Sequence, residues 1–252
     1  MSITGQGERG SIELFNDFLG AEIPVANAVA YGTSAGGCNY YLGDFKVLGD
    51  LAETDCGVVS LDKASGYARI TGTNEDGYGC ALGTGVSFSP ALNGDMILEV
   101  RCEMQALTAR NVFVGFAGTI ADQVAEPATA ATTTITKVVP CVGFLFDSQL
   151  TYGTYWHMPY ILASDTTQTS TDVQSSQVAV AGESDILKII LHRDGSADWY
   201  INDVLEQSVG AGLAATTTTL LGVLVGTWGT TTTVSDLDVD YILFKANRDW
   251  TR

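Results

Sequence analysis

Basic residues are scarce in this sequence. Its 252 residues include 12 Lys and Arg against 29 Asp and Glu, which gives a formal net charge of -17 at pH 7. Binding to nucleic-acid phosphates requires clustered Lys and Arg side chains, and here the few cations are scattered along the chain. We therefore expect no nucleic-acid partner. The acidity favours solubility and mutual repulsion between free subunits.

Long apolar runs and a basic, apolar leader are also missing. Gly, Thr, Asp or Asn interrupts every apolar stretch before it reaches the ~18 residues of a membrane helix. Residues 1–10 contain no basic start followed by an apolar segment, so the sequence predicts no secretory signal. We expect a protein that is made in a cytoplasm and has no membrane partner.

Cysteine and histidine are too few and too scattered for a disulfide framework or most metal sites. The five cysteines are an odd number, and no two are spaced as Cys-x-x-Cys. They are Cys38, Cys56, Cys80, Cys102 and Cys141. We predict buried free thiols, which behave as small apolar side chains. His157 and His192 lie far apart in the sequence, and both are predicted to be structural.

Strand patterns dominate what is present. Residues 95–105 alternate, with Met96, Leu98 and Val100 on one face and charged side chains on the other. Residues 111–118 and 140–147 are apolar on both faces, which is typical of interior strands. Helical periodicity is nearly absent. These patterns predict an all-β protein.

Turn signals divide the later strands. Asp194-Gly195 and Asn202-Asp203 separate three apolar segments within residues 185–205, which predicts a three-stranded meander. Residues 119–137 show no sustained period and indicate an exposed loop or edge hairpin. No Pro-rich or Gly/Ser-rich linker divides the chain. We expect one domain over residues 13–252, preceded by an N-terminal arm over residues 1–12.

The order of these segments resembles the concanavalin A-like or laminin G-like jelly roll, in the form found in tailed-bacteriophage virion proteins. The resemblance covers most of residues 13–250. It is carried by residues 13–20, 114–116, 142–147, 239–242 and 247–250, and by the Asp194-Gly195 and Asn202-Asp203 turns. It implies two antiparallel sheets packed face to face with little or no helix, and a location in the virion.

Catalytic carboxylates are the first candidate chemistry. Glycan hydrolases with this fold carry Glu-x-Asp-x-x-Glu along one strand, and this sequence lacks it. Glu99 and Glu103 share a strand face with Arg101 between them, which predicts either a carboxylate pair or a solvated face bridged by the arginine. The absent signature favours a protein that is not an enzyme and needs no cofactor.

A second candidate is the alternating series Asp236, Asp238 and Asp240. Alternation places all three carboxylates on one strand face, with Leu237, Val239 and Tyr241 on the other. Three aligned carboxylates repel one another unless a positive charge answers them. They therefore indicate a calcium site, contact with a basic patch on a neighbour, or a solvent face.

Aromatic side chains crowd residues 151–160 and form the best binding-site candidate. They are Tyr152, Tyr155, Trp156 and Tyr160. An exposed cluster of this kind stacks on a sugar ring or is buried in a partner interface. The alternative is that Trp156 closes the end of the sandwich.

Two functions from different classes follow. The first is a capsid decoration protein that binds the major capsid protein or other virion subunits, as a homo-oligomer and preferably a trimer. The second is a carbohydrate-binding or host-attachment component of the tail or spike, in which the aromatic residues bind a glycan. Because a fold does not fix function, the choice between them depends on the site.

Overall fold

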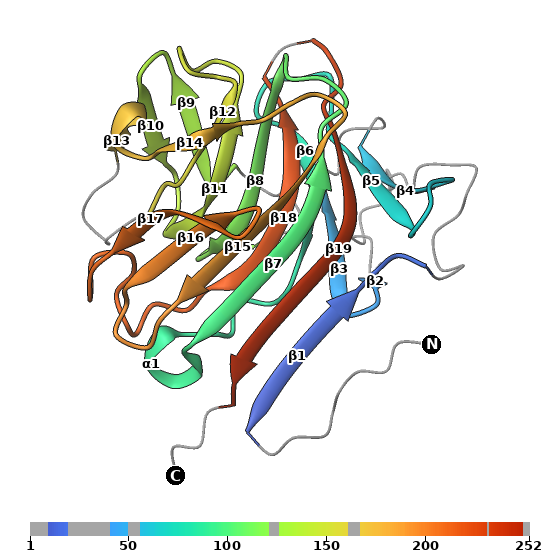
Figure 1. Ribbon diagram of the computed structural model, residues 1–252. Coiled ribbons are helices and arrows are strands. Elements are labelled where there is room, and N and C mark those ends of the chain that lie inside the picture. Colours follow the sequence, from blue (N-terminus) through green and yellow to red (C-terminus); the bar gives the residue numbers. More distant parts are fainter. Residues whose placement is uncertain are drawn as a thin grey trace.

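The computed structural model describes residues 10–19, 41–49, 56–120, 126–160, 167–230 and 232–248. Within these ranges the chain forms two eight-stranded sheets that lie face to face, and a three-stranded sheet beside them (Figure 1). The first large sheet has the strand order β17 (Val204–Val209), β16 (Ala197–Ile201), β15 (Ser184–Leu191), β7 (Met96–Glu103), β19 (Asp236–Asn247), β5 (Tyr67–Thr71) and β4 (Gly57–Leu61), and β1 (Ser11–Asn16) also pairs with β19.

The other strands complete the sandwich. The second large sheet has the order β14 (Gln174–Val178), β12 (Tyr155–His157), β11 (Cys141–Asp147), β8 (Arg110–Ala117), β18 (Gly222–Gly229), β6 (Gly79–Gly83), β3 (Phe45–Gly49) and β2 (Tyr41–Leu42). The small sheet contains β13 (Thr167–Thr169), β10 (Thr134–Lys137) and β9 (Ala128–Ala131). Helical structure among the described residues is limited to α1 (Pro90–Asn93) and the 3-10 turn η1 (Ser170–Asp172). The predicted all-β sandwich is confirmed.

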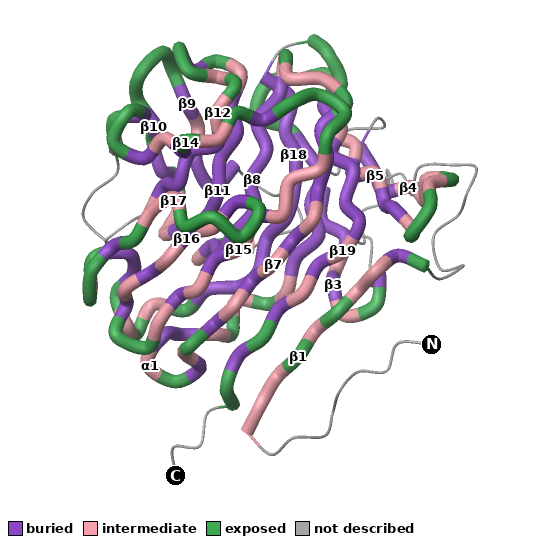
Figure 2. Tube along the Cα trace, viewed as in Figure 1, coloured by how far each residue is buried: buried purple, intermediate pink, exposed green. Residues whose placement is uncertain are grey.

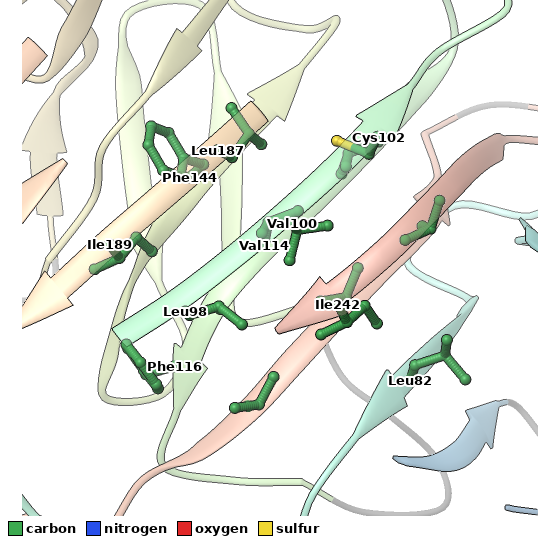
Figure 3. Close-up of a cluster of buried hydrophobic side chains, with 14 of the residues drawn as sticks. Leu82, Leu98, Val100, Cys102, Val114, Phe116, Phe144, Leu187, Ile189 and Ile242 are labelled. Carbon is green, nitrogen blue, oxygen red and sulfur yellow. The ribbon is translucent and has the colours of Figure 1, made fainter. Parts of the chain in front are cut away.

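Strand alternation builds the core between the two large sheets. On β7, Met96, Leu98 and Val100 are fully buried, as the sequence pattern predicts. Figure 3 shows Leu98 and Val100 in the layer that they share with Val114 and Phe116 of β8. Burial of this continuous apolar layer is the main favourable term that holds the two sheets together.

The strands at the centre of the second sheet are buried on both faces. Figure 2 shows β8 and β18 buried along their whole length. On the outer face, Phe113 lies over the pair Gly115 and Gly143, where an added Cβ at Gly143 would overlap its ring. Glycine at this pair therefore leaves room for the Phe113 ring on the outer face of the sheet.

Of the two alternatives for residues 119–137, an exposed loop or an edge hairpin, the structure shows the hairpin, and one of its faces is buried. β9 and β10 form a hairpin, and Ala128 and Ile135 pack on Leu145 at the outer face of the second sheet. The threonines at the hairpin tip are exposed. Buried and exposed residues alternate along β10, so only one face of the hairpin covers the second large sheet. Residues 121–125 of this connection lie outside the described residues.

The predicted meander is confirmed as β15, β16 and β17. Gly195 has φ +79°, and Asn202 and Asp203 have φ 52° and 65°. These are the left-handed conformations that tight turns need, and Gly, Asn and Asp adopt them most readily. Two sharp reversals therefore follow directly from the local sequence.

The N-terminal boundary differs slightly from the prediction. Ser11 and Ile12, the last positions assigned to the arm, belong to β1 and pair with Asn247 and Ala246 of β19. Ile12 also packs against the core, which explains why the strand begins before residue 13. Residues 1–9 and residues 249–252 lie outside the described residues.

Buried thiols are confirmed for four of the five cysteines. Cys56, Cys80, Cys102 and Cys141 are free and buried, and Cys38 lies outside the described residues. Burial raises the pKa of the Cys141 thiol to about 12, so it stays protonated and unreactive. In the described part of the chain, no helix is long and apolar enough to cross a membrane.

Candidate functional site

Three loops at one end of the sandwich surround an open cavity of about 430 Å³. We call it the loop hollow. Its lining comes from the β7–β8 connection (residues 107–109), the turn after β11 (residues 148–150 and 153–154) and residue 230 after β18. The side chains and backbone that line it carry hydroxyl, amide and apolar groups, and none of these described lining residues is charged.

Hydrogen bonds hold the loops of the hollow together. Ser148 Oγ accepts a bond from the Arg110 backbone N–H at 3.0 Å and lies 3.4 Å from Thr230 Oγ1. Gln149 Nε2 donates to the Thr230 carbonyl oxygen at 3.3 Å. Because the side chains of one loop bind the backbone of another, the polar groups are fixed in place before any ligand arrives.

A buried carboxyl group shapes the turn that lines the loop hollow. Asp147 is 1% exposed; its Oδ1 accepts from the Gln149 backbone N–H at 2.8 Å, and its Oδ2 accepts from Asn111 Nδ2 at 3.2 Å. Burial raises the pKa of Asp147 to about 6. Burial, together with the nearby Asp147 and Asp76 charges, raises the pKa of Glu126 to about 8. Glu126 is therefore mostly neutral at pH 7.

The four aromatic residues predicted as one cluster are divided by the structure. Tyr152, 43% exposed, lies in the turn whose neighbouring residues line the loop hollow. Its ring meets the Tyr155 ring edge-on at a centroid distance of 6.4 Å. Tyr160 instead packs on Trp199, with centroids 5.9 Å apart. Of the cluster, Tyr152 and Tyr155 are brought together near the loop hollow.

Trp156 belongs to the core, so its assignment to an exposed site is wrong, and its burial is compatible with the alternative that it closes the sandwich. It is 1% exposed and packs edge-on against Phe144 and Phe146. Its Nε1 donates to Asp185 Oδ2 on the opposite sheet at 2.9 Å. The physical reason is strand alternation in β12, which turns Trp156 inward while Tyr155 stays partly exposed.

Basic side chains of the same chain form ion pairs with the three aspartates of β19. Arg69 Nε and Nη2 donate to Asp238 Oδ1 and Oδ2 at 2.7 and 3.0 Å. Arg101 Nη1 donates to Asp240 Oδ2 at 2.6 Å, and Asp236 lies 3.8 Å from Arg69. In the described ranges, no group of three His, Cys, Asp or Glu side chains is placed to hold a metal ion. The aspartates therefore have partners without calcium.

A bulge changes the alternation predicted for this strand. The register against β7 shifts between Val239 and Tyr241, so Asp240 is an extra residue on β19. Tyr241 was expected on the core face with Leu237, but its hydroxyl donates to Glu99 Oε1 on the outer face at 2.8 Å. The bulge turns Tyr241 outward, and this correction could not come from the alternating sequence alone.

The carboxylates of β7 have separate partners. Glu103 accepts from Lys63 Nζ at 2.8 Å, whereas Glu99 accepts from the Tyr241 hydroxyl. Arg101 lies between them in sequence and binds Asp240 rather than either glutamate. The arrangement is a network of ion pairs across one sheet face and not a pair of carboxylates flanking a substrate.

Neither histidine belongs to the loop hollow. His157 is fully buried, and burial lowers its pKa to about 4, so its ring is neutral. His192 lies between two carboxylates, with Nδ1 3.2 Å from Asp95 and Nε2 3.0 Å from Asp198. The structural roles predicted for both histidines stay predictions.

Comparison with known proteins identifies the fold. No protein-family model and no curated protein matches the sequence. A solved protein of unknown function from Shewanella oneidensis MR-1 is similar over 97% of this chain and 90% of its own, with 12% identity and a TM-score of 0.57. The chain has a concanavalin A-like jelly-roll fold. This confirms the fold that the sequence resemblance implies.

Two further similar structures have names that refer to carbohydrate. The Emp46p carbohydrate recognition domain matches at 7% identity and TM-score 0.54, over 88% of this chain and 97% of its own. The cellulose induced protein Cip1 matches at 14% identity and TM-score 0.53, over 81% of this chain and 92% of its own. At these identities the similarity shows the fold alone. It leaves the virion role and the absence of catalysis as predictions.

Proposed function

We propose that this protein binds carbohydrate at the loop hollow and does not catalyse a reaction on it. The observation that carries the proposal is the combination of neutral hydroxyl and amide groups in the hollow with the exposed ring of Tyr152 in its lining turn. Sugars present hydroxyl groups on their edges and C–H groups on their faces. Fixed polar groups in the hollow and an exposed aromatic ring in the same turn match the two kinds of surface.

Two observations support a binding role over catalysis. The lining residues of the loop hollow that the structure describes include no carboxylate, whereas glycoside hydrolysis uses two carboxyl groups across the scissile bond. Two acidic side chains of neighbouring segments, Asp147 and Glu126, are buried. The fold itself is compatible with both roles, so these local features decide the proposal.

Replacing Tyr152 with alanine tests this function. We expect glycan-array and calorimetric binding to weaken about tenfold, because one stacking surface is lost. Phe15→Ala is the matched control, since Phe15 is 44% exposed and lies on β1. Equal binding by both variants, at unchanged melting temperature, would remove the loop hollow from consideration. Release of reducing sugar from any bound glycan would contradict the absence of catalysis.

A structural role in a virion, as an oligomer on capsid subunits, is the second candidate. It is favoured by exposed apolar side chains on two strands, with Val178 48% exposed on β14 and Val204 and Leu205 each 52% exposed on β17. These are the last strands of the two large sheets at the same edge, where Ser176 binds Glu206. Apolar side chains on adjacent sheet edges suit contact with a second copy of the chain.

Sedimentation of the intact protein tests the second candidate. We expect a concentration-dependent oligomer that Val204→Lys and Leu205→Lys convert to a monomer, since each places an unpaired charge in the contact. Val234→Lys, at a residue 37% exposed elsewhere, is the control. A monomer at all concentrations would contradict self-association through this edge.

A further inference from the structure

A second cavity, of about 350 Å³, lies at the other rim of the second sheet, where β2, β3 and the end of β6 adjoin β1. We call it the edge hollow. Its lining includes Tyr41, Asp44 and Lys46, with an apolar floor from Leu14 and Leu48. Sequence patterns gave no sign of it, because its walls come from segments far apart in the chain.

The walls of the edge hollow are held by backbone pairing. β2 and β3 form a hairpin in which Tyr41 pairs with Lys46, and Gly43 takes the positive φ of 58° that the tight turn needs. Asn16 Nδ2 of β1 donates to the Leu42 carbonyl oxygen at 2.9 Å. The hairpin is therefore anchored both to its own sheet and to the strand that borders the cavity.

Asp44 presents an acceptor that the described part of the protein does not satisfy. Its Oδ2 is buried and has no hydrogen-bond partner among the described residues. Burial raises the pKa of this carboxyl group. A buried acceptor without a partner costs free energy, and a ligand that donates a hydrogen bond recovers that cost. The edge hollow therefore favours a ligand with a donor at this position.

Charge and shape restrict the ligand further. Asp44 disfavours an anion and Lys46 disfavours a cation, so a neutral molecule with both donors and acceptors suits the pair. Tyr41 is 58% exposed and adds an aromatic ring to the apolar part of the lining. A pyranose ring combines these properties, because its hydroxyl groups donate and accept while one face carries C–H groups.

We propose that the edge hollow is a second carbohydrate site that takes one neutral sugar unit. In it Asp44 Oδ2 accepts from a sugar hydroxyl, Lys46 donates to a neighbouring oxygen and Tyr41 stacks on the apolar face. The inference shares the class of ligand with the proposed function but not its location. The two sites lie at different parts of the sandwich, so a glycan surface that spans both would gain avidity.

The test uses the intact protein and a panel of neutral methyl glycosides and disaccharides, with binding followed by saturation-transfer NMR and calorimetry. In a Tyr152→Ala background, which weakens the loop hollow, binding should persist. Asp44→Asn should then weaken sugar binding about tenfold, because a neutral amide oxygen accepts a hydrogen bond from the sugar hydroxyl less strongly than a carboxylate does. Tyr41→Ala, at an exposed position that the core does not need, should weaken it to a similar extent.

Controls separate this proposal from the first one. Asp203→Asn, in the exposed turn between β16 and β17, should leave binding unchanged. Absence of sugar binding in the Tyr152→Ala variant overturns the proposal for the edge hollow and leaves the loop hollow intact. Binding that neither Asp44→Asn nor Tyr41→Ala changes has the same meaning. Preference for free glycine, a zwitterion, over every glycoside also overturns it. Sensitivity to Asp44→Asn with none to Tyr152→Ala supports the edge hollow and contradicts the loop hollow.

Discussion

Replacing Trp156 with alanine should lower the free energy of unfolding by about 3–5 kcal/mol, the usual cost of emptying a large aromatic site. The ring is 1% exposed and lies against Phe144 and Phe146, which cannot collapse into the space without leaving β11. The change also leaves Asp185 Oδ2 without its indole donor. Denaturant unfolding followed by circular dichroism measures the loss.

Two other variants separate packing from hydrogen bonding at this site. Trp156→Phe keeps most of the apolar volume and loses the Nε1 donor, so it should cost less than Trp156→Ala. Tyr152→Ala, at an exposed ring four residues earlier, should change stability by less than about 0.5 kcal/mol. A Trp156→Ala protein as stable as the Tyr152→Ala protein would show that Trp156 does not close the sandwich.

Glu126→Gln should make the protein more stable at pH 8 and remove part of its pH dependence. Burial raises the pKa of Glu126 to about 8, whereas in the unfolded chain this carboxyl group ionises near its ordinary pKa of 4.5. Between these values the folded state holds a proton that the unfolded state releases, so rising pH favours unfolding. The stabilising effect is complete below pH 4.5 and is lost as pH rises through 8. Its full size is on the order of 5 kcal/mol, since each unit of pKa difference corresponds to about 1.4 kcal/mol.

The difference between the two proteins isolates Glu126 from other titrating groups. Asp147, with a pKa raised to about 6, contributes in the same direction at lower pH. Burial acts to lower the pKa of His192, but hydrogen bonds to Asp198 and Asp95 outweigh burial and raise this pKa. The stability that the protonated His192 ring contributes to the fold is therefore also lost as the pH rises. Both remain in the variant. If the free energies of unfolding of the two proteins changed in parallel between pH 5 and 9, a buried, neutral Glu126 would be contradicted.

Local patterns predicted the parts of this fold that depend on neighbours in the chain. The two faces of β7 follow from alternation, and the turns at Gly195 and Asn202-Asp203 follow from residues that tolerate positive φ. The bulge at Asp240 has no such signal, because residues 236–241 alternate without interruption. Its position is set by how β19 pairs with β7 and β5, which is a long-range property.

The candidate sites show the same limit. A crowd of aromatic residues at 151–160 indicated a binding region, but the short strand β12 turned Trp156 into the core, while Tyr152 lies exposed in the turn before that strand. The loop hollow combines three connections separated by tens of residues, and the edge hollow combines β1, a hairpin and the end of β6. Neither lining has a sequence spacing that could reveal it, because tertiary contact alone brings the segments together.

The pairing of β19 has a consequence for synthesis of the chain. Along one side this strand meets β5 through residues 236–239 and then β1 through residues 242–247. β1 is the earliest described strand to leave the ribosome, and its partner β19 follows it by more than 200 residues. A nascent chain must therefore carry an unpaired β1 until β19 has been made. Closure of the sandwich at this seam is then a late event with a large loop entropy to overcome.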